Sequence, residues 1–244
     1  MDAATKDKFI QRWNKYFPGA DLPVTFYYTD EPRGAEAPDH HRCFIAQLAA
    51  VREGRPVAFD VDSVLCSGGK RYLGFSQTLM PNFEYFLSCG IPGKLEGERY
   101  KKSPQLVNEL MKKAPEFVAP APYVVFKRWD RLEPEDEPKV VVFFAPPDVL
   151  SGLFTLAGFE ESEPQAVIAP FCAGCASIVQ YPYLEGESER PRAVLGMFDV
   201  SARPWVPREM LSFAVPMAKF ARMIDDMDES FLITNSWEQV KARM

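Results

Sequence analysis

Cysteine is the residue type whose spacing in this sequence points most directly to chemistry. Cys172 and Cys175 are separated by two residues, and this spacing lets two thiolates bind the same zinc ion or iron–sulfur cluster. No second pair has this spacing, so further ligands would come from Cys43 and Cys66 in separate segments. The sequence therefore predicts a protein that binds an iron–sulfur cluster or a metal ion such as zinc. Its predicted ligands are Cys43, Cys66, Cys172 and Cys175.

The same cysteines allow two other interpretations. A Cys-x-x-Cys pair also suits thiol–disulfide exchange, in which a helix N-terminus lowers the pKa of one thiol. The run from Phe171 to Cys175 matches only half of the aromatic-Cys-Gly-Pro-Cys pattern that is typical of thioredoxin-like sites. Free cysteine also occurs simply as a small buried apolar residue. This last interpretation is the simpler one for Cys43 and Cys89, which have apolar neighbours on expected helices.

Two basic segments predict a different kind of site, which would bind a small anion without a metal. Each places an arginine beside a tyrosine after a glycine, at Gly69–Tyr72 and at Gly97–Tyr100. The second leads into a helix that Ser103 and Pro104 should begin, and the amides and dipole of a helix N-terminus favour an anion. These loops would bind a small carboxylate or phosphate, as in a sensing protein. A solvated loop with neutralised charges explains the same residues without a ligand.

Several common signatures of enzymes are missing from the sequence. It has no glycine-rich dinucleotide loop, no Walker loop, no G-x-S-x-G elbow and no H-E-x-x-H motif. Its two histidines, His40 and His41, are adjacent, which does not favour a Ser-His-Asp hydrolase. We therefore assign no catalytic residue from the sequence.

Composition limits the kinds of partner that the protein should have. The 244 residues carry 28 lysines and arginines against 34 aspartates and glutamates, a net charge of −6, whereas attraction to nucleic-acid phosphates requires a basic surface. No apolar run approaches the roughly 18 residues of a membrane-spanning helix, and the N-terminal residues form no apolar secretory core. Five cysteines, an odd number, fit reduced thiols better than a disulfide framework. We expect a cytoplasmic protein whose partner is a small molecule or a metal ion.

Alternating strands and helices should position these residues. Each half of the chain reads strand, helix, strand and then a loop with cysteine and glycine, Cys66–Gly69 in the first half and Cys172–Cys175 in the second. Because strand–helix–strand units tend to be parallel and open sheets bind ligands beyond the carboxyl ends of their strands, both loops would meet at one crevice. Chance similarity between short units explains the repeat equally well. The strands expected in these two units are 24–28, 56–61, 140–144 and 166–169, and the helices between them are 40–52 and 148–157. Further strands are expected at 123–127 and 193–198.

The predicted fold is α/β or α+β, with a mixed sheet flanked by helices. We expect one domain over residues 1–244. Its two similar strand–helix–strand halves, 22–113 and 123–227, would form one compact unit.

Several short segments, in this order, resemble a known family. They are Leu22–Tyr28, Arg42–Ile45, Cys66–Gly69, Gly97–Tyr100, Ala173–Ile178, Asp199–Pro204 and Phe213–Pro216. The family is the domain of unknown function 169 family, which has no established activity. The resemblance covers the chain from Leu22 to its C-terminus.

This resemblance also bears on the expected site. Cys43, Cys66 and Cys175 match motif positions of the family, whereas Cys172 stands where relatives typically carry a glycine. A dithiol mechanism needs both residues of the pair, so the resemblance argues against it and leaves the three matching cysteines as ligands. The residues that would contact a cofactor or anion are Gly68, Gly69, Arg99 and Arg203.

Overall fold

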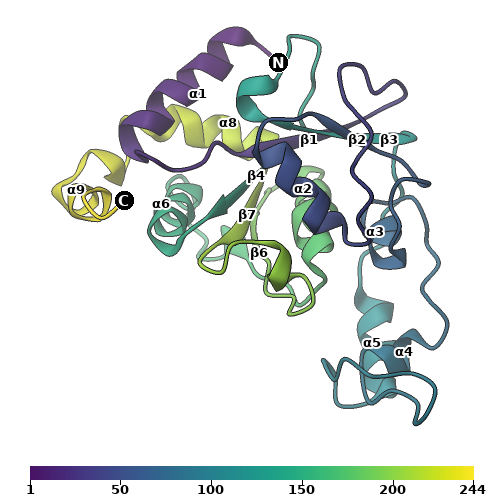
Figure 1. Ribbon diagram of the computed structural model, residues 1–244. Coiled ribbons are helices and arrows are strands. Elements are labelled where there is room, and N and C mark those ends of the chain that lie inside the picture. The colour runs from purple at the N-terminus through teal and green to yellow at the C-terminus, as the bar shows by residue number, and fades with distance from the viewer.

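A seven-stranded mixed sheet forms the centre of the protein, whose computed structural model describes residues 1–244 (Figure 1). The strand order is β2-β3-β1-β4-β7-β6-β5. Neighbouring strands are antiparallel except β5 and β6, which are parallel. The strands are β1 (Val24–Thr29), β2 (Val57–Phe59), β3 (Tyr123–Arg128), β4 (Val140–Ala145), β5 (Val167–Ile168), β6 (Ala193–Gly196) and β7 (Leu211–Pro216).

Strand β4 shows how the sheet separates two hydrophobic cores. Val142 and Phe144 belong to one core and Val141 and Phe143 to the other, because successive side chains of a strand point to opposite faces. Each core contains 23 buried residues. A sheet that is buried on both faces needs apolar residues at consecutive positions, and β4 is apolar along its whole length.

Helices and aromatic rings close the first face of the sheet. Trp13 stacks on Phe17 with ring centroids 4.3 Å apart, and Phe9 meets Trp129 edge-on at 5.0 Å. In Figure 1, α1 and α8 lie on this face at the upper left. The helices of this face are α1 (Ala3–Tyr16), α6 (Pro147–Ala157), α8 (Met217–Asp226) and α9 (Asn235–Lys241). Short 3-10 turns are η1 (Trp129–Arg131), η3 (Arg203–Trp205) and η4 (Phe231–Ile233).

The second face is covered by α2 (Phe44–Arg52) and by a helix that runs from Gly174 to Gly186. This helix contains a π-helical turn, η2 (Ala176–Gln180), and continues as α7 (Tyr181–Gly186). Beside the π turn lies α3 (Ser67–Tyr72). Turns of this kind are rare and occur frequently at functional sites.

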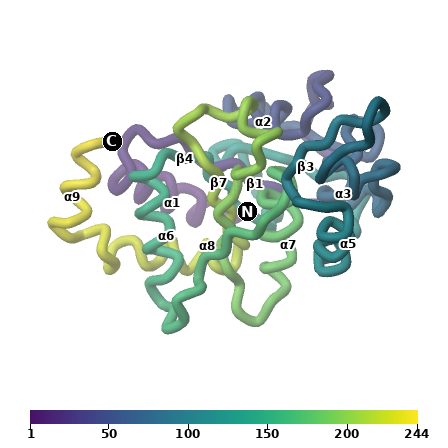
Figure 2. The backbone as a smooth tube through the Cα atoms, turned by 90° about the horizontal axis from the view of Figure 1, so that it is seen from below, coloured from purple at the N-terminus to yellow at the C-terminus, as the bar shows by residue number.

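Residues 75–118 leave the sheet as a separate lobe, which contains α4 (Phe83–Phe86) and α5 (Pro104–Lys113). The lobe projects at the lower right of Figure 1, and Figure 2 places α5 and α9 at opposite ends of the molecule. Its two ends meet where the Ala119 amide donates to the Gly74 carbonyl over 3.0 Å. Gly74 has a φ of 82°, and a Cβ there would lie 2.4 Å from the Ala119 nitrogen. Only glycine therefore fits this neck.

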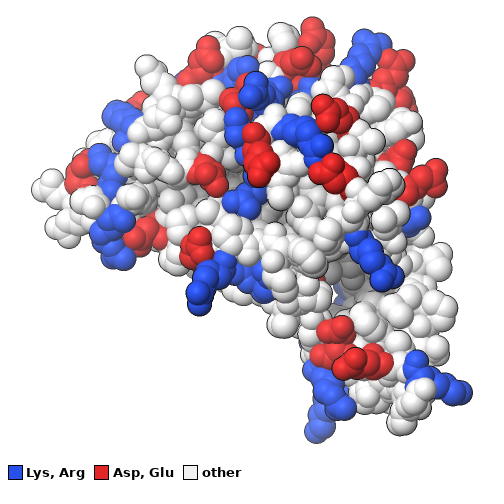
Figure 3. All heavy atoms as spheres, viewed as in Figure 1, with Lys and Arg blue, Asp and Glu red and all other residues white.

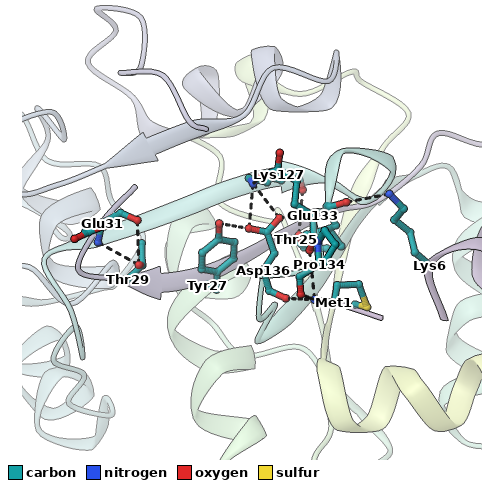
Figure 4. A network of polar contacts seen from close by, with 11 residues as sticks. Met1, Lys6, Thr25, Tyr27, Thr29, Glu31, Lys127, Glu133, Pro134 and Asp136 are labelled. Atoms are coloured by element: carbon teal, nitrogen blue, oxygen red, sulfur yellow. Dashed lines mark hydrogen bonds and ion pairs between the residues drawn. The ribbon is translucent and has the colours of Figure 1, made fainter. Parts of the chain in front are cut away.

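A buried ion pair fixes the connection between β3 and β4 (Figure 4). The Lys127 ammonium is 1% exposed and lies 2.9 Å from carboxylate oxygens of both Asp136 and Glu133. The Tyr27 hydroxyl donates to Asp136, and the Met1 ammonium donates to the carbonyl oxygens of this connection. A buried charge is tolerated when it is paired and hydrogen-bonded in this way.

The mixed sheet flanked by helices confirms the predicted fold class. Ser103 caps α5 and Pro104 occupies its first turn, as predicted. The loop predicted at Cys66–Gly69 was wrong, because Cys66 caps α3 and Gly69 lies in its first turn. Strands β1 and β2 are not neighbours, since β3 lies between them, and the organisation into two similar halves stays a prediction. No helix combines the length and the apolar character that crossing a membrane requires.

Candidate functional site

A cavity of about 510 Å³ lies between the second face of the sheet and the lobe. Its volume falls within the range of about 300–1,000 Å³ that is usual for small-molecule sites. Of its 34 lining residues, 23 are hydrophobic, so the cavity favours an apolar occupant. The space-filling view shows the lobe projecting from the body with a recess between them (Figure 3).

Four of the five cysteines line this cavity, although they come from three distant parts of the chain. Cys43 is the N-cap of α2 and Cys66 is the N-cap of α3. Cys172 lies in the segment after β5, and Cys175 is in the first turn of the helix from Gly174 to Gly186. The structure thus brings together the four cysteines that the sequence suggested as ligands. The fifth, Cys89, is exposed on the lobe.

Glycine allows the backbone to approach the thiols closely. The Cys66 sulfur accepts a hydrogen bond from the Gly69 amide at 3.1 Å. A Cβ on Gly69 would lie 2.7 Å from both that sulfur and a methyl group of Val64. Gly69 therefore has a packing reason to be glycine, whereas the nearest atom to a Cβ on Gly68 would be 3.9 Å away.

Burial favours the protonated form of the Cys172 and Cys175 thiols. Burial raises the pKa of Cys172 to about 12. Burial also raises the pKa of Cys175 well above its usual range, and the nearby Cys66, Asp199 and Cys43 add to this effect. Reactive dithiols instead have a lowered pKa, so these values run against thiol–disulfide chemistry at Cys172 and Cys175. All five cysteines are free.

No three histidine, cysteine, aspartate or glutamate side chains are arranged to share one metal ion. The cysteines line a common wall without forming a preformed mononuclear site.

The residues predicted to contact an anion are divided between the cavity and the surface. Gly68 and Gly69 line the cavity, whereas Arg99 and Arg203 do not. The Arg203 guanidinium donates to the carbonyl oxygens of Met210 at 2.6 Å and of Arg208 at 2.8 Å. Its hydrogen bonds hold the segment between η3 and β7 together, so its role in this structure is a local structural one.

Tyr100, beside Arg99, does line the cavity and joins the lobe to the body. Its hydroxyl oxygen accepts a hydrogen bond from the Ser201 amide at 3.0 Å. Next to it, the Lys101 ammonium lies 3.7 Å from the ring centre of Phe171, a cation–π contact. The segments that follow β5 and β6 therefore both hold the lobe.

Asp199 connects these segments to the π-bulged helix. One carboxylate oxygen accepts from the Gly174 amide at 3.0 Å, and the other accepts from the amide and hydroxyl of Ser201. Both carboxylate oxygens thus accept hydrogen bonds from within the protein. The position of this carboxylate fixes where the helix that carries Cys175 begins.

Aromatic residues at the cavity are the part of the site that sequence reasoning missed. Phe171, Phe198 and Trp205 line it and are 53%, 57% and 42% exposed. Their signal in the sequence was adjacency, since Phe171 precedes Cys172 and Phe198 precedes Asp199. Large apolar side chains that remain exposed around a cavity are typical of ligand sites.

Comparison with known proteins identifies the family but no characterised relative. No curated protein and no solved structure gives a significant match. The model of the DUF169 family, described as an uncharacterised ArCR, matches residues 20–226. This match confirms the resemblance that the short motifs indicated, and the chain belongs to the DUF169 family.

Proposed function

We propose that the protein binds a small, mainly apolar organic molecule in the cavity between the sheet and the lobe. The observation that carries this proposal is the apolar wall that the lobe presents to the cavity. Phe83 and Phe86 of α4 and Leu110 and Met111 of α5 line it, and α4 has no buried residue. When a ligand covers such a wall, each Å² of apolar surface removed from water contributes roughly 25 cal/mol of favourable binding free energy.

The dye N-phenyl-naphthylamine tests this proposal, because it is apolar and fluoresces when it leaves water. We expect saturable binding at one site per chain. Met111→Trp places a larger side chain at the cavity wall and should abolish most of the signal. Glu109→Trp, on an exposed position of the same helix, is the matched control and should bind as the wild type does. Non-saturable binding, or binding that Met111→Trp leaves unchanged, contradicts the proposal.

A second candidate function is binding of an iron–sulfur cluster or a zinc ion by the thiol wall. It is supported by the arrival of Cys43, Cys66, Cys172 and Cys175 at one cavity from three segments. In a cluster the thiolates bind different iron atoms, so they need not converge on a single point. Binding would have to deprotonate the thiols and release protons, and this costs free energy because burial raises the pKa of Cys172 and Cys175.

Anaerobic purification with iron, sulfide and zinc analysis tests the second candidate. Stoichiometric metal should accompany the native protein, and Cys66→Ser and Cys175→Ser should each lose it. Cys89→Ser, which changes the exposed cysteine outside the cavity, should retain it. A colourless, metal-free native protein rejects this candidate and leaves the first one standing.

A further inference from the structure

The composition of the cavity wall narrows the class of molecule that it would hold. Nine of the 34 lining residues are aromatic, about a quarter, against 13% of the whole chain. Wall residues of this type offer flat faces and polarised edges. Contacts between aromatic rings contribute about 0.5–1.5 kcal/mol of favourable free energy in addition to that of surface burial. Such a wall therefore discriminates between flat aromatic ligands and saturated ones.

Ring pairing gives a second and independent observation. In the interior of the protein, aromatic rings contact each other, such as Phe26 and Phe126 at 5.1 Å and Phe9 and Phe220 at 5.1 Å. Within the wall, Phe83 and Phe86 pair at 6.2 Å. Five other rings of the wall pair with no ring of the protein. They are Tyr72, Tyr100, Phe171, Tyr181 and Phe198.

These five rings come from five separate segments of the fold. Tyr72 ends α3, Tyr181 begins α7, and Tyr100 belongs to the lobe. Phe171 and Phe198 follow β5 and β6. Rings from separate elements therefore face one space without meeting each other.

We infer that the ligand of this cavity is a planar aromatic molecule whose ring system contacts the wall rings that pair with no other aromatic ring of the protein. This inference rests on the proposed function and specifies the class of molecule bound. The three methionines of the wall, Met80, Met111 and Met197, suit the same ligand, because thioether sulfur makes favourable contacts with ring edges.

Two alcohols with the same carbon skeleton test the inference. Naphthol is planar and aromatic, and decahydronaphthol is its saturated counterpart. Each is used to displace N-phenyl-naphthylamine from the wild-type protein. Because ring contacts add to surface burial, naphthol should bind about tenfold more tightly. Equal displacement by both alcohols, or no displacement by naphthol, overturns the inference, and the saturable binding of the dye still supports the proposed function.

Variants of the wall locate the effect. Phe198→Leu keeps an apolar side chain and should weaken naphthol binding by about threefold to tenfold, with decahydronaphthol changed by less than about twofold. Phe154→Leu is the matched control, because Phe154 is 52% exposed on α6 and does not line the cavity. If Phe198→Leu weakens both alcohols equally, the residue contributes only apolar surface and the inference fails. If the dye does not bind at all, the result contradicts the proposed function itself.

Discussion

The Ser201 amide donates to the Tyr100 hydroxyl oxygen over 3.0 Å, across 101 positions of the sequence. This contact ties the lobe to the segment after β6. The same amide also lies 3.0 Å from a carboxylate oxygen of Asp199. The Ser201 segment is therefore held by Asp199 even without Tyr100, so the contact with Tyr100 acts specifically on the lobe.

Removing this contact should loosen the lobe and speed release from the cavity. Tyr100→Phe keeps the ring but removes the oxygen, and a typical hydrogen bond contributes about 0.5–1.5 kcal/mol. We expect stopped-flow dissociation of N-phenyl-naphthylamine to become about threefold to tenfold faster. Tyr85→Phe serves as the control, since Tyr85 is 37% exposed on α4 and does not line the cavity. Equal dissociation rates for Tyr100→Phe and wild type would show that the contact does not hold the lobe.

The Cys172 thiol should react slowly and with a steep dependence on pH. Its pKa is raised to about 12 by burial, so at pH 8 roughly one thiol in ten thousand is the reactive thiolate. Alkylation by iodoacetamide, followed by mass spectrometry of the peptides, should show Cys172 far behind the exposed Cys89. Its rate should rise about tenfold per pH unit between pH 8 and 10. A rate that does not change over this range would contradict the raised pKa.

Two neighbouring glycines should respond differently to alanine. In Gly69→Ala the new methyl group would lie 2.7 Å from Cys66 and Val64 atoms, and overpacking of this kind costs about 1–3 kcal/mol. In Gly68→Ala the nearest atom is 3.9 Å away, and alanine should stabilise α3 by up to about 1 kcal/mol. Urea unfolding measures both free energies. Equal free energies of unfolding for the two variants would contradict this explanation.

The buried ion pair should contribute far more to stability than a surface pair. Lys127→Met leaves the buried Asp136 carboxylate without its cation, which typically costs about 3–5 kcal/mol. Lys8→Met removes an exposed partner of Asp225 and should cost less than about 1 kcal/mol. Urea unfolding at neutral pH compares them. A loss of less than about 1 kcal/mol for Lys127→Met would mean that the tyrosine and amide donors around Asp136 suffice on their own.

Features that depend on neighbouring residues were predicted correctly from the sequence. Ser103 and Pro104 mark the start of α5 because capping depends on adjacent residues. Cys66 and Cys175 do line one cavity. However, the strands that precede them, β2 and β5, run in opposite directions in the sheet, so the expected meeting of two strand ends does not explain it.

Features that depend on distant partners could not be predicted in this way. Strand β7 was missed because Ser212 near its start and Pro216 at its end interrupt the kind of apolar run that marked β4. Its partner β4 lies far away in the sequence. Arg203 was expected as an anion contact because it lies within the segment Asp199–Pro204 that resembles the family. Only the folded chain shows that backbone carbonyl oxygens already occupy its guanidinium.

Because successive side chains of β4 point to opposite faces, the two faces of the sheet can serve different purposes. One face of the sheet is closed by α1, α6 and α8 and by rings that pair with each other. On the other face the cavity lies beside the core that α2 and the helix from Gly174 to Gly186 cover. Its rim residues Phe171 and Phe198 contribute little to that core because they remain exposed. Substitutions at these rim positions should therefore change binding of the proposed ligand and leave the free energy of unfolding nearly unchanged. The two faces of the sheet thus separate the residues that stabilise the fold from those that border the cavity.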